Sequence, residues 1–155
     1  MTVYLIRHAH AGRRSAWSGD DQLRPVSARG VEQAEGVADL LAGREIGRVA
    51  SSPATRCIQT VEPLATRLGL EVEVDKRLAE GGNPRDMLEA ILGESQSQAL
   101  CAHGDLIPEV IARLVRAGMK ASGAKRCQKG SVWEIDIEQG QAVRARYHAP
   151  PSRSS

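Results

Sequence analysis

The sequence predicts an α/β fold with three layers (α/β/α), in which helices cover both faces of a mostly parallel central sheet. Short apolar runs rich in β-forming residues alternate along the chain with segments whose apolar residues recur at helical spacing. The chain has 155 residues, of which 41% are hydrophobic, so it can bury a core of its own. We expect one domain over residues 1–148 and a disordered tail over 149–155.

The predicted strands are short, and turn or helix signals separate each one from the next. The first covers residues 2–6, an apolar run that polar residues bound on both sides. The others are predicted, in chain order, over 46–51, 70–74, 98–102, 131–137 and 141–147. Among them the run LEVEV at 70–74 alternates apolar and polar residues as a strand should, and a Glu-Gln-Gly turn joins the last two.

The predicted helices begin at capping residues and end at glycines. The first follows Ser27 and stops near Gly43, and we expect the second to begin with Ser52 as N-cap and Pro53 as its first helical residue. That helix should end at Gly69. The third and fourth helices are predicted over 83–93 and 106–115. Residues 13–25 have turn and polar residues without apolar periodicity, which indicates a loop.

Composition and charge exclude several classes of protein. The net charge is only +2 and the cations are spread along the chain, so we expect neither a nucleic-acid nor a membrane partner. Three cysteines without C-x-x-C spacing argue against a disulfide framework and against a cysteine-rich zinc site. No stretch resembles a secretory leader or reaches transmembrane length, which leads us to expect a cytoplasmic protein.

Polar residues gather where the predicted parallel strands end. In chain order these are Arg7 and His8, then Arg56 one helical turn beyond the second strand, then Glu80, then His103. In such sheets the ligand site lies outside the carboxyl ends of the strands, so we expect these side chains to converge on one rim.

This set of side chains suits the chemistry of phosphoryl transfer. Two guanidinium groups match the oxygens of a phosphate, and a neutral imidazole can attack phosphorus as a nucleophile. The surrounding cations would stabilise charge on the transferring group, and a carboxylic acid opposite could protonate the leaving oxygen.

Four sequence blocks carry a resemblance to a known family. They are R-H-A-H-A, R-P-V-S-x-x-G-x-x-Q-A, S-S-P-x-x-R-C-x-Q-T and A-H-G, which lie in this order between residues 3 and about 108. Together they resemble the histidine phosphatase superfamily, also called phosphoglycerate mutase-like or RHG. The short length and the R-H-A-x-A start resemble SixA-type phosphohistidine phosphatases. The stretches SGDDQLRPVSARG, TRCIQTVEPLA and RCQKGSVW are similar to the histidine phosphatase domain that follows a Nudix domain in some bacterial proteins, although this chain has no Nudix box.

The resemblance implies a role for each residue on the rim. His8 would carry the phosphoryl group as a phosphohistidine, Arg7 and Arg56 would clamp the phosphate, and His103 would contact a phosphoryl oxygen. Glu80 is the best match to the family's acid. Water would then hydrolyse the phosphohistidine. No metal or other cofactor is expected, since arginine and histidine supply the positive charge that Mg²⁺ supplies elsewhere.

Two departures from the family pattern favour a phosphatase with an open site over a mutase. The residue after His8 is Ala9 where the RHG name has glycine, and the large insertions of true mutases are absent. The substrate stays open between a phosphohistidine protein and a phosphorylated small molecule such as a phosphate ester or nucleotide. A phosphate-binding module without turnover and a metal hydrolase using His8 and His10 are the alternative classes. The oligomeric state is left open.

Other polar residues have a simpler structural interpretation. We expect His10 to line the entrance or pack in its loop. Arg24 and Lys129 are expected to be solvated surface residues, with contact to the far end of a substrate as the alternative. Ser52 is expected only to cap a helix. Cys57 is expected to be a small buried residue, because the C-x5-R spacing of cysteine phosphatases is absent.

Overall fold

The computed structural model describes residues 1–151, and within them six strands form one sheet in the order β3-β2-β4-β1-β5-β6. The strands are β1 Thr2–Arg7, β2 Arg48–Ser51, β3 Val72–Val74, β4 Gln98–Ala102, β5 Val132–Glu138 and β6 Gln141–His148. The pairs from β3 to β1 are parallel, whereas β5 pairs antiparallel with both β1 and β6. The prediction of a mostly parallel sheet is therefore confirmed, with an antiparallel hairpin added at one edge.

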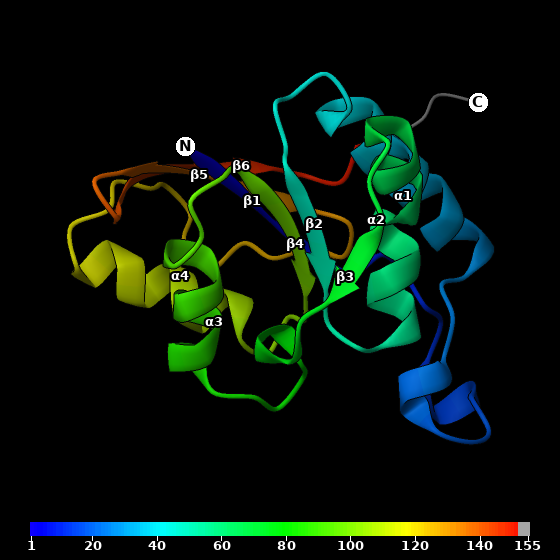
Figure 1. Ribbon diagram of the computed structural model, residues 1–155. Coiled ribbons are helices and arrows are strands. Elements are labelled where there is room, and N and C mark those ends of the chain that lie inside the picture. Colours follow the sequence, from blue (N-terminus) through cyan, green and yellow to red (C-terminus); the bar gives the residue numbers. More distant parts are fainter. Residues whose placement is uncertain (152–155) are drawn as a thin grey trace.

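Four helices in the described residues cover the two faces of this sheet (Figure 1). They are α1 Ala28–Leu41, α2 Thr55–Leu68, α3 Pro84–Leu92 and α4 Ile107–Arg116. One apolar cluster contains side chains of α1 and α2, and a second contains side chains of α3 and α4. The expected α/β architecture with helices on both faces is confirmed. None of the helices in residues 1–151 combines the length and the apolar character that a bilayer crossing requires.

The central strand β1 shows how the sequence builds both cores. Val3 and Leu5 belong to the cluster under α3 and α4, and Tyr4 and Ile6 belong to the cluster under α1 and α2. Successive side chains of a strand point to opposite faces, so a continuous apolar run is what a strand covered on both sides requires. Full burial of such an aliphatic side chain stabilises the fold by about 1.5–3 kcal/mol.

The predicted start of α2 is wrong. The helix begins at Thr55, and Ala54 before it is extended, with φ −64° and ψ 136°, and supplies no side-chain cap. Ser52 is turned instead toward a side chain on the neighbouring strand's loop, where its Oγ lies 2.8 Å from Nε2 of His103. Ser52 Oγ also accepts a hydrogen bond from the backbone N–H of Ala54 at 3.3 Å, so the serine combines a local bond before the helix with a tertiary contact to His103.

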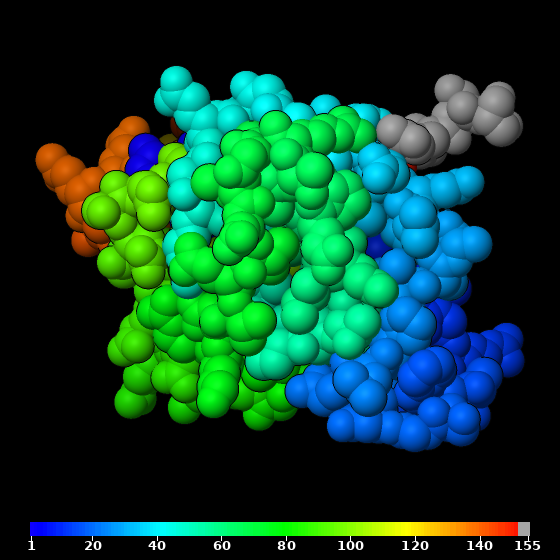
Figure 2. Space-filling view, turned by 45° about the vertical axis from the view of Figure 1, so that its right-hand side comes forward, coloured from blue at the N-terminus to red at the C-terminus, as the bar shows by residue number. Residues whose placement is uncertain are grey.

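The segment between β1 and α1 is less irregular than predicted. Two 3-10 helices, Arg14–Ala16 and Asp21–Leu23, lie within the predicted loop. This segment forms a lobe at the lower right of Figures 1 and 2, in blue. Where the chain leaves this lobe and enters α1, Gly30 packs against the loop after β1. A Cβ at Gly30 would lie 2.0 Å from the carbonyl oxygen of His10. Only glycine fits that close approach, and Ser27 caps α1 beside it by accepting a hydrogen bond from the Gly30 N–H.

The C-terminal segment is described up to Pro151. A Cβ at Gly36 of α1 would meet Pro151 at 3.1 Å, so the last described residues lie against that helix. Residues 152–155 lie outside the described part of the chain. The domain boundary at residue 148 and the disordered tail stay predictions.

Candidate active site

The carboxyl ends of three parallel strands meet at one edge of the sheet. In the register of the sheet, Arg7 at the end of β1 pairs with Ala102 at the end of β4, and Ser51 of β2 pairs with Cys101. His8 and His103 are the next residues after β1 and β4. The strand ends therefore deliver both histidines to the same rim.

A pocket of about 510 Å³ opens on this rim. Four of the five predicted site residues line it, namely Arg7, His8, Arg56 and Glu80. The fifth, His103, is buried behind them, with its ring centroid 5.4 Å from that of His8. The structure thus brings together all five residues from four separate stretches of the sequence.

His8 is held as a neutral imidazole with its Nε2 nitrogen free. Its Nδ1 donates to the carbonyl oxygen of Ala9 at 2.9 Å, which fixes the tautomer, because a carbonyl can only accept. Burial lowers the pKa of His8 to about 3, against the opposing effect of that hydrogen bond. The positive charges of His103, Arg56 and Arg7 lower the pKa further. At neutral pH the Nε2 lone pair is therefore available to a reacting group.

Three buried side-chain nitrogens beside His8 have no hydrogen-bond partner among the described residues. They are Nε of Arg7, Nε of Arg56 and Nδ1 of His103. A buried donor without a partner costs about 1–3 kcal/mol, and more when the group is charged. Folded proteins seldom leave such groups open without a functional reason, and three together mark the place of an anion.

The two guanidinium groups are fixed by contacts to the backbone. Arg7 donates from Nη1 to the carbonyl oxygen of Cys127 at 2.7 Å. Arg56 has no exposed surface and donates from Nη1 to the carbonyl oxygen of Asp21 at 2.9 Å. At Gly104 a Cβ would lie 2.6 Å from the Arg7 guanidinium carbon, so the glycine after His103 makes room for this arginine. The protein alone therefore holds the guanidinium groups of Arg7 and Arg56 in place before any ligand binds.

His103 is oriented by two residues whose role the sequence did not reveal. Its Nε2 lies 2.8 Å from Oγ of Ser52 and 3.5 Å from Sγ of Cys57. Both residues belong to the S-S-P-x-x-R-C block around Arg56, which was the signal available for finding them. With Nε2 held there, Nδ1 is the atom that faces Glu80, whose Oε2 is 3.7 Å away.

Glu80 lies at the mouth of the pocket between two arginines. Its Oε1 accepts from Nη2 of Arg14 at 3.0 Å and lies 3.4 Å from Nη2 of Arg56. The side chain is 38% exposed, and Glu80 is the most exposed of the five site residues. A carboxyl group in this position can reach a group that enters or leaves the pocket.

The expectation of a solvated Arg24 is wrong. Only 7% of the residue is exposed, and its Nη1 donates to the carbonyl oxygen of Ala11 at 2.6 Å. Its Nε donates to Asp21 at 2.9 Å. Arg24 and the half-buried Lys129 both line the pocket. The fold of the 13–25 segment, which has no sequence periodicity, places Arg24 there.

His10 packs in its loop, one of the two places expected for it. Its Nδ1 lies 2.7 Å from Oγ of Ser27, and it does not line the pocket. Within residues 1–151 no group of three or more His, Cys, Asp or Glu side chains could hold a metal ion.

Comparison with known proteins gives a family match and fold matches. A family model described as the histidine phosphatase superfamily (branch 1) matches residues 3–86. The 8-oxo-(d)GTP phosphatase of Mycolicibacterium smegmatis is 32% identical over 156 residues, covering 97% of this chain and 48% of that protein. The chain thus spans about half the length of this curated relative.

Two solved structures show the same fold. The protein histidine phosphatase SixA complexed with tungstate has a TM-score of 0.76 and 24% identity, covering 98% of this chain and 97% of its own. Mycobacterial glucosyl-3-phosphoglycerate phosphatase has a TM-score of 0.71 and 18% identity, covering 99% of both chains. The sheet and helices described above are those of this group of phosphatases.

Proposed function

The chain belongs to the histidine phosphatase superfamily (branch 1), and from that premise we propose that it hydrolyses a phosphorylated substrate through a phosphohistidine intermediate on His8. One observation carries the proposal. A buried, neutral imidazole with its Nε2 free lies beside three buried donors that lack partners among the described residues. A nucleophile and an incomplete anion site occur at the same place, as phosphoryl transfer requires.

The reaction proceeds in two displacements at phosphorus. Nε2 of His8 forms a bond to phosphorus while the bond to the leaving oxygen breaks, and that oxygen keeps the electron pair. Glu80, at the mouth, gives the leaving oxygen a proton. Water then attacks the phosphohistidine, Glu80 takes a proton from it, and the P–N bond breaks, which returns neutral His8 and releases phosphate.

The positive charge for both steps comes from protein side chains. Arg7, Arg56 and His103 surround the position of the phosphoryl group and stabilise the charge on its oxygens. These groups do the work that Mg²⁺ does in other phosphoryl-transfer enzymes, so we propose a reaction without a metal ion. SixA, which shares this fold, was solved in complex with tungstate, an oxyanion with the tetrahedral shape of phosphate.

The names of the similar proteins leave two classes of substrate. The Mycolicibacterium protein is named as an 8-oxo-(d)GTP phosphatase, and the solved SixA structure as a protein histidine phosphatase. A phosphorylated small molecule and a phosphohistidine protein are therefore the two candidates. The cytoplasmic location stays a prediction.

The test is hydrolysis of p-nitrophenyl phosphate in the presence of EDTA. We expect activity in the wild type and in His148→Gln, a matched control because His148 lies on β6 and bonds to Glu134. His8→Ala should lose at least about 10³-fold in kcat, since the nucleophile is gone. Acid quenching of the wild type during turnover should also trap less phosphohistidine than alkaline quenching, because the P–N bond is labile to acid.

Three results would contradict the proposal. Phosphate binding without turnover would indicate a binding module, and equal activity of wild type and His8→Ala would place the chemistry elsewhere. Loss of activity on adding EDTA would contradict the reaction without a metal ion.

A further inference from the structure

The cations of the pocket outnumber what one phosphate group needs. Six cationic side chains line it, namely Arg7, Arg13, Arg14, Arg24, Arg56 and Lys129. Two nearby carboxylates, those of Asp21 and Glu80, pair with three of these cations: Arg14, Arg24 and Arg56. Arg7, Arg13 and Lys129 have no carboxylate partner within residues 1–151. Arg7 belongs to the phosphate clamp, so two cations remain without an anion.

Lys129 is the more informative of these two cations, because it is half-buried. Its ammonium has neither a hydrogen bond nor an ion pair among the described residues. Burial lowers the pKa of Lys129, and the positive charges of Arg7, Arg24, Arg29 and Arg56 lower it further. A partly desolvated cation among four others is unfavourable unless an anion joins them.

The backbone fixes Lys129 close to the nucleophile. The next residue, Gly130, donates its N–H toward the carbonyl oxygens of Arg7 and His8, at 3.1 and 3.2 Å. Its φ of 81° lies in the left-handed region that glycine adopts without strain. Lys129 therefore approaches the pocket from the loop before β5, next to the strand end that carries His8.

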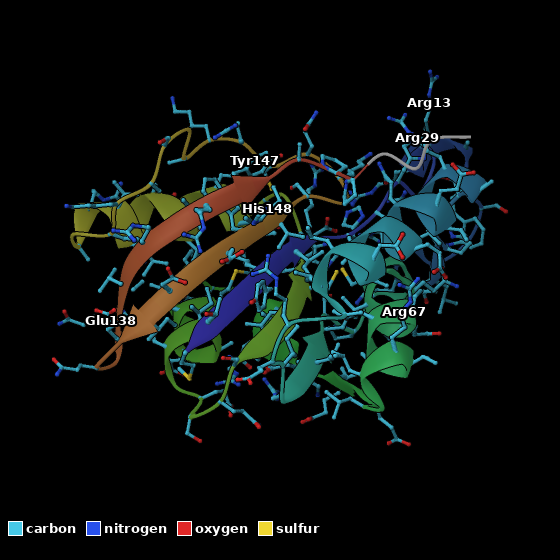
Figure 3. All side chains as sticks on the ribbon, turned by 90° about the horizontal axis from the view of Figure 1, so that it is seen from above. Arg13, Arg29, Arg67, Glu138, Tyr147 and His148 are labelled. Carbon is cyan, nitrogen blue, oxygen red and sulfur yellow. The ribbon has the colours of Figure 1, made fainter. Side chains whose placement is uncertain are left out.

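Arg24 and Arg13 extend the positive surface away from the clamp. Arg24 is held rigidly by Ala11 and Asp21, as described above, whereas Arg13 is exposed. Figure 3 shows Arg13 and Arg29 at the same end of the molecule, opposite the β5–β6 turn marked by Glu138. Cationic side chains therefore line the pocket from Arg7 and Arg56 to the exposed Arg13.

We propose that Lys129, with Arg24 beside it, forms a second anion subsite, and that the substrate is a small molecule with a diphosphate group. This inference rests on the proposed function and names its substrate class. The terminal phosphoryl group would lie at His8, and the neighbouring phosphate would lie toward Lys129. A bridging P–O–P group places two charges next to each other, which matches two adjacent cation sets, whereas a monoester carries its charge on one phosphate only.

The chemistry of the leaving group agrees with this substrate class. When His8 attacks the terminal phosphorus, the bridging P–O bond breaks, and the leaving group is a phosphate that keeps the electron pair. Such an oxygen is far less basic than an alkoxide, so its departure needs less help from a proton donor. Lys129 would also stabilise the charge that develops on it.

The test compares two non-hydrolysable probes, methylphosphonate and methylenediphosphonate, by titration calorimetry. We expect the diphosphonate to bind the wild type at least tenfold more tightly than the monophosphonate. Lys129→Met should lower the affinity for the diphosphonate at least tenfold and the affinity for the monophosphonate less than threefold. Lys125→Met is the matched control, because Lys125 is exposed and does not line the pocket, and it should change neither affinity.

Two outcomes would overturn the subsite. Equal affinity of both probes for the wild type would indicate a site for one phosphoryl group, as on a phosphohistidine protein. If Lys129→Met lowered the affinity for both probes equally, with an unchanged melting temperature, Lys129 would attract any anion to the pocket and would not form a separate subsite. Neither measurement depends on turnover, so failure of the proposed function appears separately, as the absence of p-nitrophenyl phosphate hydrolysis in the wild type.

Discussion

Two of the charged clusters in the described residues differ in how completely the fold satisfies their hydrogen bonds. The first surrounds Asp75, which is 8% exposed. Its carboxylate accepts hydrogen bonds from Nη2 of Arg77 at 2.7 Å, from the Arg77 backbone N–H at 3.0 Å and from Nη2 of Arg48 at 3.1 Å. The bonds from Arg77, and then that from Arg48, lower the pKa of Asp75 to about 2 against the effect of burial.

The second cluster is the pocket, where buried donors of Arg7, Arg56 and His103 have no acceptor among the described residues. Both clusters place ions out of water, yet only the first one completes their hydrogen bonds. The difference separates a structural cluster, which stabilises the fold, from a functional one, which keeps binding capacity at a cost in stability. Mutations should therefore affect the two clusters in opposite ways.

The largest effect should follow from removing a cation of the pocket. Arg7→Met should lower kcat/KM for p-nitrophenyl phosphate about 10²–10³-fold, as the loss of one transition-state donor typically does. The melting temperature should stay the same or rise, because a half-buried cation whose Nε has no partner among the described residues is removed. Arg113→Met, on the exposed surface of α4, serves as the control for both measurements. A fall of several degrees in Arg7→Met would show that this arginine is structural.

The Asp75 cluster should respond in the opposite way. Asp75→Asn should lower the free energy of unfolding by about 2–3 kcal/mol at pH 7, while kcat per folded molecule stays unchanged. The folded pKa lies below the unfolded one, so the carboxylate stabilises the fold above the unfolded pKa of about 4. That contribution is lost as the pH falls toward 2. Urea unfolding of both proteins between pH 7 and 2 should show their difference shrinking, and a constant difference would refute this assignment.

A smaller effect should come from Ser52, which positions His103 without lining the pocket. Ser52→Ala should lower kcat about tenfold, equivalent to about 1.4 kcal/mol, and change KM less, because the His103 ring loses the partner of its Nε2. Ser52→Thr keeps a hydroxyl group and should recover most of the activity. The pH profile of kcat should also move in Ser52→Ala alone, and an unchanged profile would leave Ser52 with only a packing role.

The sequence predicts best what local patterns determine. Arg7, His8 and His103 lie where apolar strands end, and Arg56 lies at the start of the helix that follows β2, so the convergence of these four at one rim follows from parallel strand pairing. Ser52 was misassigned because a serine before a proline is a good local cap, and only the folded chain shows the competing bond to His103.

Arg24 and Lys129 were misplaced for a related reason. Both lie in segments without apolar periodicity, and their approach to the pocket depends on tertiary contacts that no local pattern encodes. Arg24 is held by the carbonyl oxygen of Ala11, across the turn of its own loop, and Gly130 is held by the carbonyl oxygens of Arg7 and His8, more than a hundred residues away. Sequence patterns therefore located the proposed nucleophile and the proposed phosphate clamp, whereas the placement of the other pocket residues required the fold.

The position of β1 in the sheet has a consequence for how the protein folds. Of the six strands in the described residues this one comes first in chain order, yet its two neighbours are β4 at residues 98–102 and β5 at residues 132–138. Until those segments are synthesised, the strand that precedes His8 has no partner on either side. Pairing over such separations is slow to form, so folding should be limited by closure of the sheet around β1. A stalled or truncated chain that lacks β5 would leave an apolar strand open to association with other chains.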